Sequence, residues 1–305
     1  MNREFYKRVK EELDNNKNIY IATIVKDKKD KHLGKKILKV DNEIIIEEQE
    51  NMEFYKAVID KINFNEFGKI VKINDDIEIS IEQLISKPSL IICGGGHIAL
   101  SLASMAKMLD FNTTVIDDRE EFANKERFPA VDNIICDSFT NALENIDFNK
   151  NSYFVVVTRG HRADQECVEK ILKNEFRYLG MIGSKAKVAN SIRQLLEKGY
   201  NTEDINKVNA PIGINIGAKT PAEIAVSIMA QIIQEKNNDN VSSIDEEILK
   251  EIVCDKDGKV LVSILDKRGS SPRGIDAKML VMEDGTFTGT IGGGSVENAV
   301  YEKAI

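Results

Sequence analysis

The sequence has 305 residues, about twice the usual size of a single domain, so two or three domains are expected. Hydrophobic residues make up 42% of it and charged residues 30%, a balance that supports folded cores and excludes a disordered chain. The formal net charge of −8 disfavours a nucleic-acid partner, because an acidic surface repels phosphate backbones. No apolar run approaches the roughly 18–20 residues of a membrane span, and the charged N-terminal residues lack the apolar core of a secretion signal. We therefore expect a cytoplasmic protein without a membrane span.

The four cysteines are scattered along the chain, at Cys93, Cys136, Cys167 and Cys254. None belongs to a CxxC pair or to a set with zinc-like spacing, which favours buried free thiols in a reducing compartment and predicts no metal centre. No Ser–His–Asp or Cys–His arrangement has a recognisable spacing, so the sequence identifies no catalytic residue.

Hydrophobic periodicity predicts a small α/β domain in residues 1–85 and a Rossmann-type domain in residues 88–236. The first has helices expected at 4–15 and 52–62, and strands at 19–25, 36–40, 43–46, 70–73 and 77–81. The second has strands expected at 90–93, 113–116, 133–136, 153–158 and 178–181, and helices at 98–109, 165–174, 187–198 and 221–234. Near-continuous apolar strands that alternate with helices are typical of a parallel sheet covered on both faces.

A polar linker at residues 235–243 leads to a third segment, residues 245–305. Its expected helix (244–253), strand (260–265), long loop, hairpin (278–282 and 286–290) and final helix from Ser295 repeat the element order of the first segment. Two interpretations remain open: a second, incomplete copy of the same small α/β domain, or a chance similarity between two α/β segments. A short hairpin with an uncovered face is marginal in water, so we expect this segment to dock on the first one or on a second subunit, which favours a homodimer.

A glycine loop follows the first strand of the Rossmann-type domain and opens its first helix. Residues 93–99, Cys-Gly-Gly-Gly-His-Ile-Ala, match the GxGxxA phosphate-binding loop. Gly94 would make the tight turn and Gly96 would let a phosphate approach, while His97 would either cap the helix or donate to a bound phosphate or pterin. Asp117 ends the next strand where a ribose-binding acid belongs, which favours an NAD-like nucleotide over a 2′-phosphorylated one.

Further loops follow parallel strands, and the carboxyl ends of such strands share one edge of a sheet. We therefore expect one crevice that binds an anionic cofactor. The expected binding residues are Gly94, Gly95, Gly96, His97, Asp117, Asp118, Arg119, Asp137, Thr158, Arg159, Gly160, His161, Gly183, Ser184 and Lys185. Outside this domain, residues 267–274 carry two arginines among turn residues, and residues 291–297 contain a second glycine turn able to present N–H groups to the same anion.

These motifs together resemble the XdhC/CoxI family, accessory proteins of xanthine dehydrogenase and related molybdenum hydroxylases. The resemblance rests on residues 90–99, 115–119, 158–161, 178–184 and, most distinctively, 210–225, Ala-Pro-Ile-Gly-Ile-Asn-Ile-Gly-Ala-Lys-Thr-Pro-Ala-Glu-Ile-Ala. Residues 268–273 and 291–297 resemble the smaller domain of the family. The resemblance implies a chaperone, non-catalytic or weakly catalytic, that binds and protects the molybdenum cofactor (molybdopterin). It would help to insert the cofactor, in sulfurated form, into a molybdenum hydroxylase apo-enzyme, and a cysteine desulfurase is a candidate further partner.

Two features depart from this family. Its small domain usually precedes the Rossmann domain, whereas here the clearer motif follows it and a degenerate version stands in front. The second glycine turn has Ser295 where the family commonly has a cysteine, and a hydroxyl is a far weaker ligand for molybdenum or sulfur than a thiolate. Two alternatives use the same glycine loop: an NAD-dependent oxidoreductase and a nucleotide-sensing regulatory protein.

Overall fold

The computed structural model describes residues 2–47, 50–238, 244–254, 258–265 and 277–304. The chain forms two compact units, one from Lys87–Asp239 and the other from Met1–Ser86 together with Asn240–Ile305. The fold class is α/β with a six-stranded parallel sheet of Rossmann type, which confirms the class predicted from the sequence. None of the described helices is long and apolar enough to cross a membrane.

The Lys87–Asp239 unit is built on the parallel sheet. Its strands are β6 (Ser89–Cys93), β7 (Asn112–Asp117), β8 (Asn133–Cys136), β9 (Ser152–Val156), β10 (Tyr178–Met181) and β11 (Val208–Asn209). Their order across the sheet is β11-β10-β9-β6-β7-β8, and every neighbouring pair is parallel. The chain thus builds the sheet outward from β6 in both directions, which makes the border between β6 and β9 the topological switch point.

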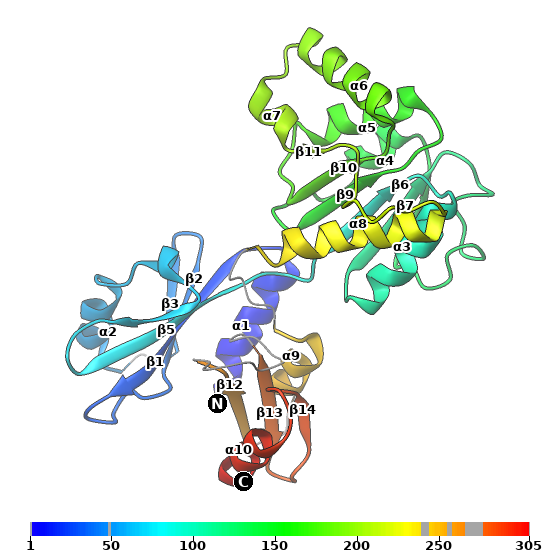
Figure 1. Ribbon diagram of the computed structural model, residues 1–305. Coiled ribbons are helices and arrows are strands. Elements are labelled where there is room, and N and C mark those ends of the chain that lie inside the picture. The colour runs from blue at the N-terminus through cyan, green and yellow to red at the C-terminus, as the bar shows by residue number, and fades with distance from the viewer. Residues whose placement is uncertain (1, 48–49, 239–243, 255–257, 266–276, 305) are drawn as a thin grey trace. The chain divides into compact units, whose positions relative to one another are not determined.

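Helices cover both faces of this sheet. The helices α3 (His97–Met108) and α8 (Pro221–Lys236) lie together on one face, as Figure 1 shows. The other face is covered by α4 (Phe139–Glu144), α5 (His161–Ile171), α6 (Lys185–Glu197) and α7 (Thr202–Asn206). Successive side chains of a strand point to opposite faces, so Leu90 and Ile92 join the first core while Ile91 and Cys93 join the second.

The distinctive segment at residues 210–225 connects β11 to α8 and begins that helix. Thr220 and Glu223 form a capping box, in which each side chain accepts from the backbone N–H of the other residue. Gly213 has a φ of +92°, and a Cβ there would lie 2.3 Å from Ser227 Oγ. Gln231 accepts a hydrogen bond from the Gly213 N–H at 2.7 Å. These residues fix the return of the chain across the sheet.

The other unit contains a five-stranded antiparallel sheet of order β3-β2-β1-β5-β4. The strands are β1 (Ile19–Asp27), β2 (Lys36–Val40), β3 (Glu43–Ile46), β4 (Lys69–Lys72) and β5 (Ile77–Leu84). One face packs against α2 (Met52–Ile59) and the 3₁₀ turn at Phe64–Glu66. The opposite face packs against α1 (Arg3–Asp14).

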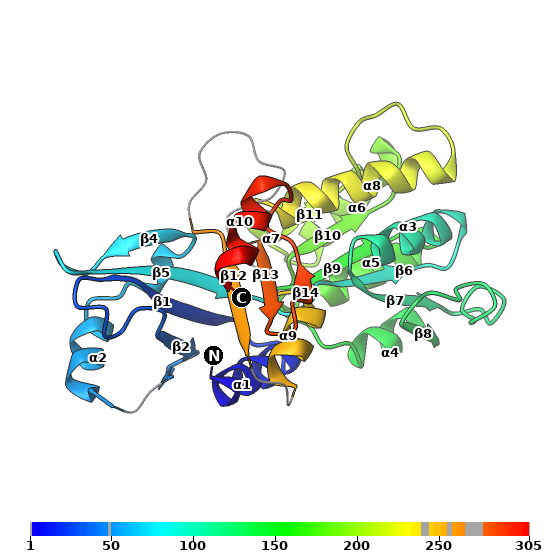
Figure 2. The ribbon, with the colours of Figure 1, turned by 90° about the horizontal axis from the view of Figure 1, so that it is seen from below.

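The C-terminal segment completes this unit. It consists of α9 (Glu246–Val253), a three-stranded antiparallel sheet of β12 (Lys259–Ser263), β13 (Lys278–Met282) and β14 (Phe287–Gly289), and α10 (Ser295–Ala304). Phe5 and Val9 of α1 share one core with Ile248 of α9 and Leu280 of β13. The helices α1 and α9 lie side by side in Figures 1 and 2. The first segment therefore supplies the docking surface that the short C-terminal sheet requires.

We expect Leu280→Ala to lower the free energy of unfolding of this unit by about 2–5 kcal/mol, because the side chain is 0% exposed in the shared core. Val260→Ala on the neighbouring strand is the matched control, since Val260 is 41% exposed and its loss should cost no more than about 0.5 kcal/mol. Urea denaturation followed by circular dichroism measures both. Equal stability of the two variants would contradict the shared core.

Candidate functional site

The residues expected to bind a cofactor leave the sheet at its carboxyl edge. Because β6, β7, β9 and β10 are parallel neighbours, the loops that follow them emerge on the same side. These loops begin at Gly94, Asp118, Val157 and Ile182. The loops after β6 and β9 stand next to each other at the switch point, where ligands bind in open α/β sheets.

The two helices that start at the switch point both begin with a glycine–histidine pair. Gly96 is the N-cap of α3 and Gly160 is the N-cap of α5, and neither helix start has a side-chain cap. The first backbone N–H groups of a helix have no partner within the helix, and the helix dipole makes this end positive. Two such ends on adjacent strands form a place where an anion is stabilised.

The glycines of the first loop have different roles. Gly94 has a φ of +117°, and a Cβ there would lie 2.5 Å from the carbonyl oxygen of Val157. A Cβ on Gly95 would lie 2.1 Å from the carbonyl oxygen of Phe122. A Cβ on Gly96 or Gly160 would meet no atom within 4 Å. The first two glycines are thus required by packing, whereas each of the two N-cap positions has room for a Cβ.

Asp117, at the end of β7, has a different partner from the one expected. Its side chain is 1% exposed and accepts from Gly95 N at 2.8 Å. It also accepts from Arg119 Nε at 2.8 Å, Arg119 Nη2 at 3.0 Å and Arg119 N at 3.2 Å. A carboxylate has about four acceptor positions, and these bonds occupy them. Asp117 therefore holds the glycine loop and Arg119, and it does not offer a free oxygen to a ribose hydroxyl.

These hydrogen bonds also set the charge of Asp117. Burial alone would raise the pKa of the carboxyl, but the hydrogen bonds from Arg119 and Gly95 outweigh burial and hold the pKa below its ordinary value of 3.8. Asp118, which is exposed, adds a second carboxylate 3.6 Å from Arg119 Nε. The Arg119 charge is therefore neutralised within the loop.

Arg127 is a residue of this edge that sequence reasoning missed. Its Nε donates to the Gly95 carbonyl oxygen at 2.9 Å, and its guanidinium lies 5.0 Å from the centre of the Phe122 ring. Arg119 lies over the same ring at 3.7 Å. Arg127 Nη2 is buried and has no hydrogen-bond partner in the structure. No local pattern signals this residue, because it lies in an irregular loop well beyond the end of β7.

The loop after β9 is held by a buried acid. Asp164 is 0% exposed, pairs with Lys187 of α6, and accepts from the Thr158 hydroxyl at 2.6 Å and the Thr158 N–H at 3.1 Å. Thr158 therefore shapes the loop, and its N–H and hydroxyl hydrogen are both used within it. The neighbouring Arg159 is exposed and makes no hydrogen bond or ion pair within the described part of the chain.

His161 offers a free donor at the start of α5. Asn190 Nδ2 lies 2.7 Å from His161 Nε2. Because an amide nitrogen donates, Nε2 is the acceptor and a neutral ring carries its proton on Nδ1. His161 Nδ1 is buried without a hydrogen-bond partner. His97, in the corresponding position of α3, is exposed and also has no polar partner among the residues that the structure describes.

The loops that follow β8 and β10, on either side of the switch point, are far apart. Asp137 follows β8 and is exposed, while Gly183, Ser184 and Lys185 follow β10. Four strand spacings separate β8 from β10, which is roughly 19 Å. Asp137 instead accepts from Ser138 N at 2.6 Å, and Ser184 caps α6 by accepting from Lys187 N. A single small anion at the switch point therefore cannot contact both flanks.

Cys93, the cysteine next to the glycine loop, points away from it. Its side chain is buried in the core under α5. The adjacent Cys93 thiol, together with burial, raises the pKa of Cys167 well above its ordinary value. Cys167 therefore stays a neutral thiol, and neither of the two buried sulfurs is placed to be a ligand of a bound cofactor.

The second glycine turn, in the other unit, already holds an anion of its own. Glu297 accepts from Thr290 Oγ1 at 2.5 Å and from Ile291 N at 3.0 Å. The hydrogen bonds from Thr290 and Ile291, joined by the N–H groups of Gly293 and Gly292, lower the pKa of Glu297 below its ordinary value. The hypothesis that this turn presents bare N–H groups is therefore wrong in this structure. Residues 267–274 lie outside the described part of the chain. The side chain of Ser295 also lies outside it, whereas the backbone of Ser295 is described.

Similarity to known proteins covers both units. Residues 90–232 match the XdhC Rossmann domain, and residues 255–305 match the XdhC and CoxI family. The uncharacterized protein YqeB of Escherichia coli (strain K12) is 37% identical over 153 residues, which is 50% of this chain and 28% of that protein. A probable xanthine dehydrogenase subunit of Bacillus subtilis (strain 168) is 31% identical over 156 residues, which is 51% of this chain and 45% of that protein.

One solved structure resembles this chain over a larger share. A xanthine dehydrogenase from Bacillus halodurans superposes with a TM-score of 0.61 at 27% identity, over 76% of this chain and 66% of that chain. The matched part of this chain spans less than half the length of each of the two curated relatives.

The glycine geometry predicts that alanine is tolerated at Gly96 but not at Gly94. Gly94→Ala should lower the free energy of unfolding by at least about 2 kcal/mol, because it combines a positive φ with a contact against the Val157 carbonyl. Gly96→Ala should change it by less than about 1 kcal/mol, because its φ of −71° suits alanine and no atom is near. Urea denaturation measures the free energy of unfolding of both variants. A destabilised Gly96→Ala variant would show that the space in front of α3 is filled.

The hydrogen bonds of Asp117 predict how the stability of the fold changes as the pH falls. Because the folded-state pKa is lowered, the stabilisation is complete above the unfolded-state value of 3.8 and is lost as the pH falls through the lower folded value. Asp117→Asn should therefore be less stable than the wild type at neutral pH, and its stability should fall less steeply below pH 3.8. Asp137→Asn, at an exposed site of the same edge, is the control. Parallel pH–stability curves for Asp117→Asn and the wild type would refute the assignment.

Proposed function

Because this chain belongs to the XdhC and CoxI family, we propose that it is an accessory protein for a xanthine dehydrogenase-type molybdenum hydroxylase. In this proposal the Rossmann domain, residues 88–236, binds the molybdenum cofactor as cargo, and residues 1–85 and 245–305 are two small-domain-like segments. The protein would protect the cofactor and assist its insertion, in sulfurated form, into the apo-enzyme. The names of the relatives from Bacillus subtilis and Bacillus halodurans support a xanthine dehydrogenase as the client.

One observation carries the cofactor proposal. The two helices at the switch point, α3 and α5, start with glycines that provide no side-chain cap, and no atom lies within 4 Å of where a Cβ would stand on either glycine. A phosphate group placed there would accept from the free N–H groups of both helix ends. This geometry suits the pterin-phosphate part of the cofactor, because an anionic group is what two adjacent positive helix ends select.

The residues around this position fit the same cargo. His161 Nδ1 is a buried donor without a partner, and Arg159, Lys185 and His97 are exposed cations or donors at the same edge. No described group of three or more His, Cys, Asp and Glu side chains is arranged to hold a metal ion. In the proposal the chain therefore binds the organic, phosphate-bearing part of the cofactor through its own donors.

The nucleotide alternative has less support. An NAD-like ligand needs an acid at the end of the second strand with a free oxygen for the ribose, but Asp117 is saturated by Arg119 and Gly95. The molybdenum cofactor makes no such demand. We therefore favour a non-catalytic chaperone over an oxidoreductase. A cysteine desulfurase as the source of sulfur is proposed from the family resemblance alone, and a homodimer is a separate proposal, because the first segment already packs against the C-terminal segment.

The proposal predicts opposite effects of one substitution on stability and on binding. In Gly96→Asp and Gly160→Asp, a carboxylate would cap the helix and repel an anion at the same place. Affinity for molybdopterin should fall about tenfold or more, equivalent to about 1.4 kcal/mol, while the urea midpoint stays the same or rises. Anaerobic titration with molybdopterin, followed by pterin fluorescence, measures the affinity.

The matched control is Asn201→Asp, which adds the same charge at the N-cap of α7. Helix α7 precedes β11, so its start lies away from the carboxyl edge. This variant should bind molybdopterin like the wild type. Full affinity in both glycine variants would exclude the switch point as the cofactor site, and light scattering of the wild type tests the homodimer.

A further inference from the structure

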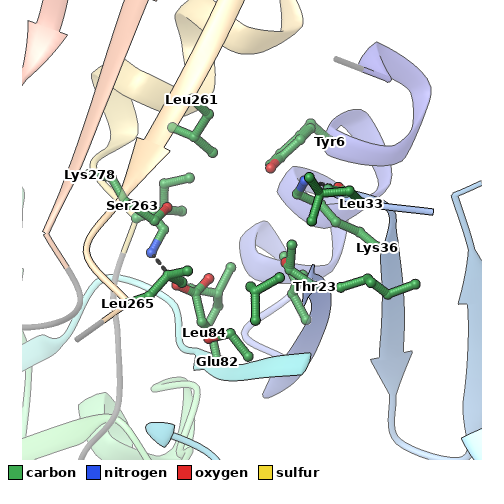
Figure 3. Close-up of a pocket in the computed structure, with 16 residues that line it drawn as sticks. Tyr6, Thr23, Leu33, Lys36, Glu82, Leu84, Leu261, Ser263, Leu265 and Lys278 are labelled. Atoms are coloured by element: carbon green, nitrogen blue, oxygen red, sulfur yellow. Dashed lines mark hydrogen bonds and ion pairs between the residues drawn. The ribbon is translucent and has the colours of Figure 1, made fainter. Parts of the chain in front are cut away.

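A cavity of about 290 Å³ lies inside the unit that contains the five-stranded sheet, and all of its lining residues belong to that unit. Figure 3 shows the residues that line it. The strands present alternate side chains to it: Ile21 and Thr23 from β1, Glu82 and Leu84 from β5, Leu261 and Ser263 from β12. Because side chains of a strand alternate between two faces, this spacing shows that ordered sheet faces build the walls.

Tyr6 of α1 points a hydroxyl group into this cavity. Its side chain is 2% exposed, and Figure 3 shows the oxygen directed at the space between the sheets. The hydroxyl makes no hydrogen bond to any residue that the structure describes. Burial, followed by the carboxylates of Glu47 and Glu82, raises the pKa of Tyr6 above its ordinary value, so the hydroxyl keeps its proton. The hydroxyl is therefore available to donate a hydrogen bond to a molecule, water included, that occupies the cavity.

Charged groups also line the cavity. Lys278 Nζ donates to Glu82 Oε1 at 2.9 Å, with the lysine side chain 4% exposed. A second cation, Lys36, reaches the wall from β2 and donates to the Gly34 carbonyl oxygen at 2.8 Å. Burial lowers the pKa of Lys36, and the nearby Glu47 and Glu82 carboxylates offset part of this effect. Among the described lining residues the charged groups are two lysines and one carboxylate, and Glu47, outside the lining, adds a second carboxylate near Lys36.

The character of the walls limits what can occupy the cavity. Apolar side chains from several elements, among them Ile21, Leu84 and Leu261, form about half of the lining, and the other side chains are polar or charged: Tyr6, Thr23, Lys36, Ser80, Glu82, Ser263 and Lys278. An apolar cavity is usually dry, whereas a binding pocket combines apolar walls with a small number of directed polar groups. The arrangement here is of the second kind.

We propose that this cavity is a binding site for a small organic monoanion, with an apolar body held between the sheets and a carboxylate or equivalent group held by Lys36 and the Tyr6 hydroxyl. The Glu82–Lys278 pair fixes the two sheets at its rim. The site belongs to a different unit from the Rossmann edge and does not depend on the cargo proposed for that edge. Because residues from both segments form it, its occupancy ties the C-terminal segment to the first one.

The test uses the full chain and three carboxylate probes: benzoate, octanoate and 2-naphthoate. Each is compared with its neutral amide and its cationic amine by heteronuclear NMR titration at millimolar concentrations. At least one carboxylate should bind, at least about tenfold more tightly than its amide, and the amine should not bind. Shifted resonances should belong to Tyr6 and the lining strands.

Two variants separate binding from folding. Lys36→Met removes the charge but keeps the length of the side chain, and should weaken the carboxylate about tenfold or more. Lys39→Met is the matched control, since Lys39 is on the same strand but packs over Tyr20 and Phe64 on the opposite face. Tyr6→Phe should weaken the carboxylate without lowering the melting temperature, because the hydroxyl has no partner to lose among the described residues.

Three results would overturn the proposal: none of the three carboxylates binds, an amide binds as tightly as its acid, or Lys36→Met and Lys39→Met bind alike. A lowered melting temperature in Tyr6→Phe would assign that hydroxyl a structural role instead. Gly96→Asp, which alters the Rossmann edge, should leave carboxylate binding unchanged. Failure of this site and failure of the cofactor site are therefore measured separately.

Discussion

The carboxylate of Asp117 ties together the parts of the Rossmann edge. It accepts from the glycine loop after β6 and from Arg119 in the loop after β7, and Arg127 holds the same glycine loop from the other side through the Gly95 carbonyl. Because hydrogen bonds hold both the N–H and the C=O of Gly95, the start of α3 has a fixed orientation. The open end of that helix can then stay uncapped without the loop collapsing onto it.

The glycine turns before α3 and α10 differ in whether an acidic side chain occupies their backbone N–H groups. In the turn before α10, Glu297 lies in the first helical turn and folds back to occupy the N–H groups. In the turn before α3, no acidic residue lies in the first helical turn. Glu297 thus closes the turn before α10, whereas α3 has no acidic residue that could do so. In α5 the acidic residue of the first turn, Asp164, is bound by Thr158 and Lys187 instead.

The Rossmann sheet could be predicted from the sequence because apolar strands and amphipathic helices carry strong periodic signals. The strand expected at 178–181 is the observed Tyr178–Met181, whereas the strand expected at 153–158 stops at Val156, because Thr158 turns to bond Asp164. The short elements α4, α7 and β11 were missed, since helices of five or six residues span less than two turns and a two-residue strand shows no alternation. Strand order placed the site residues on one edge, but their occupied hydrogen-bond positions depend on partners in distant loops, which no local pattern encodes.

The discontinuous unit is synthesised in two parts, one before and one after the Rossmann domain. Its five-stranded sheet leaves the ribosome first, but α9 and β13, which cover the face that carries Ile21 and Leu38, follow only after the whole Rossmann domain. At translation rates of about 5–20 residues per second, this delay is on the order of 10–40 s. During that time only α1 covers this face, so part of its apolar surface stays exposed while the intervening domain can complete its own fold. The unit that emerges first is therefore the one that finishes last, and a chaperone that holds nascent chains would meet it at that face.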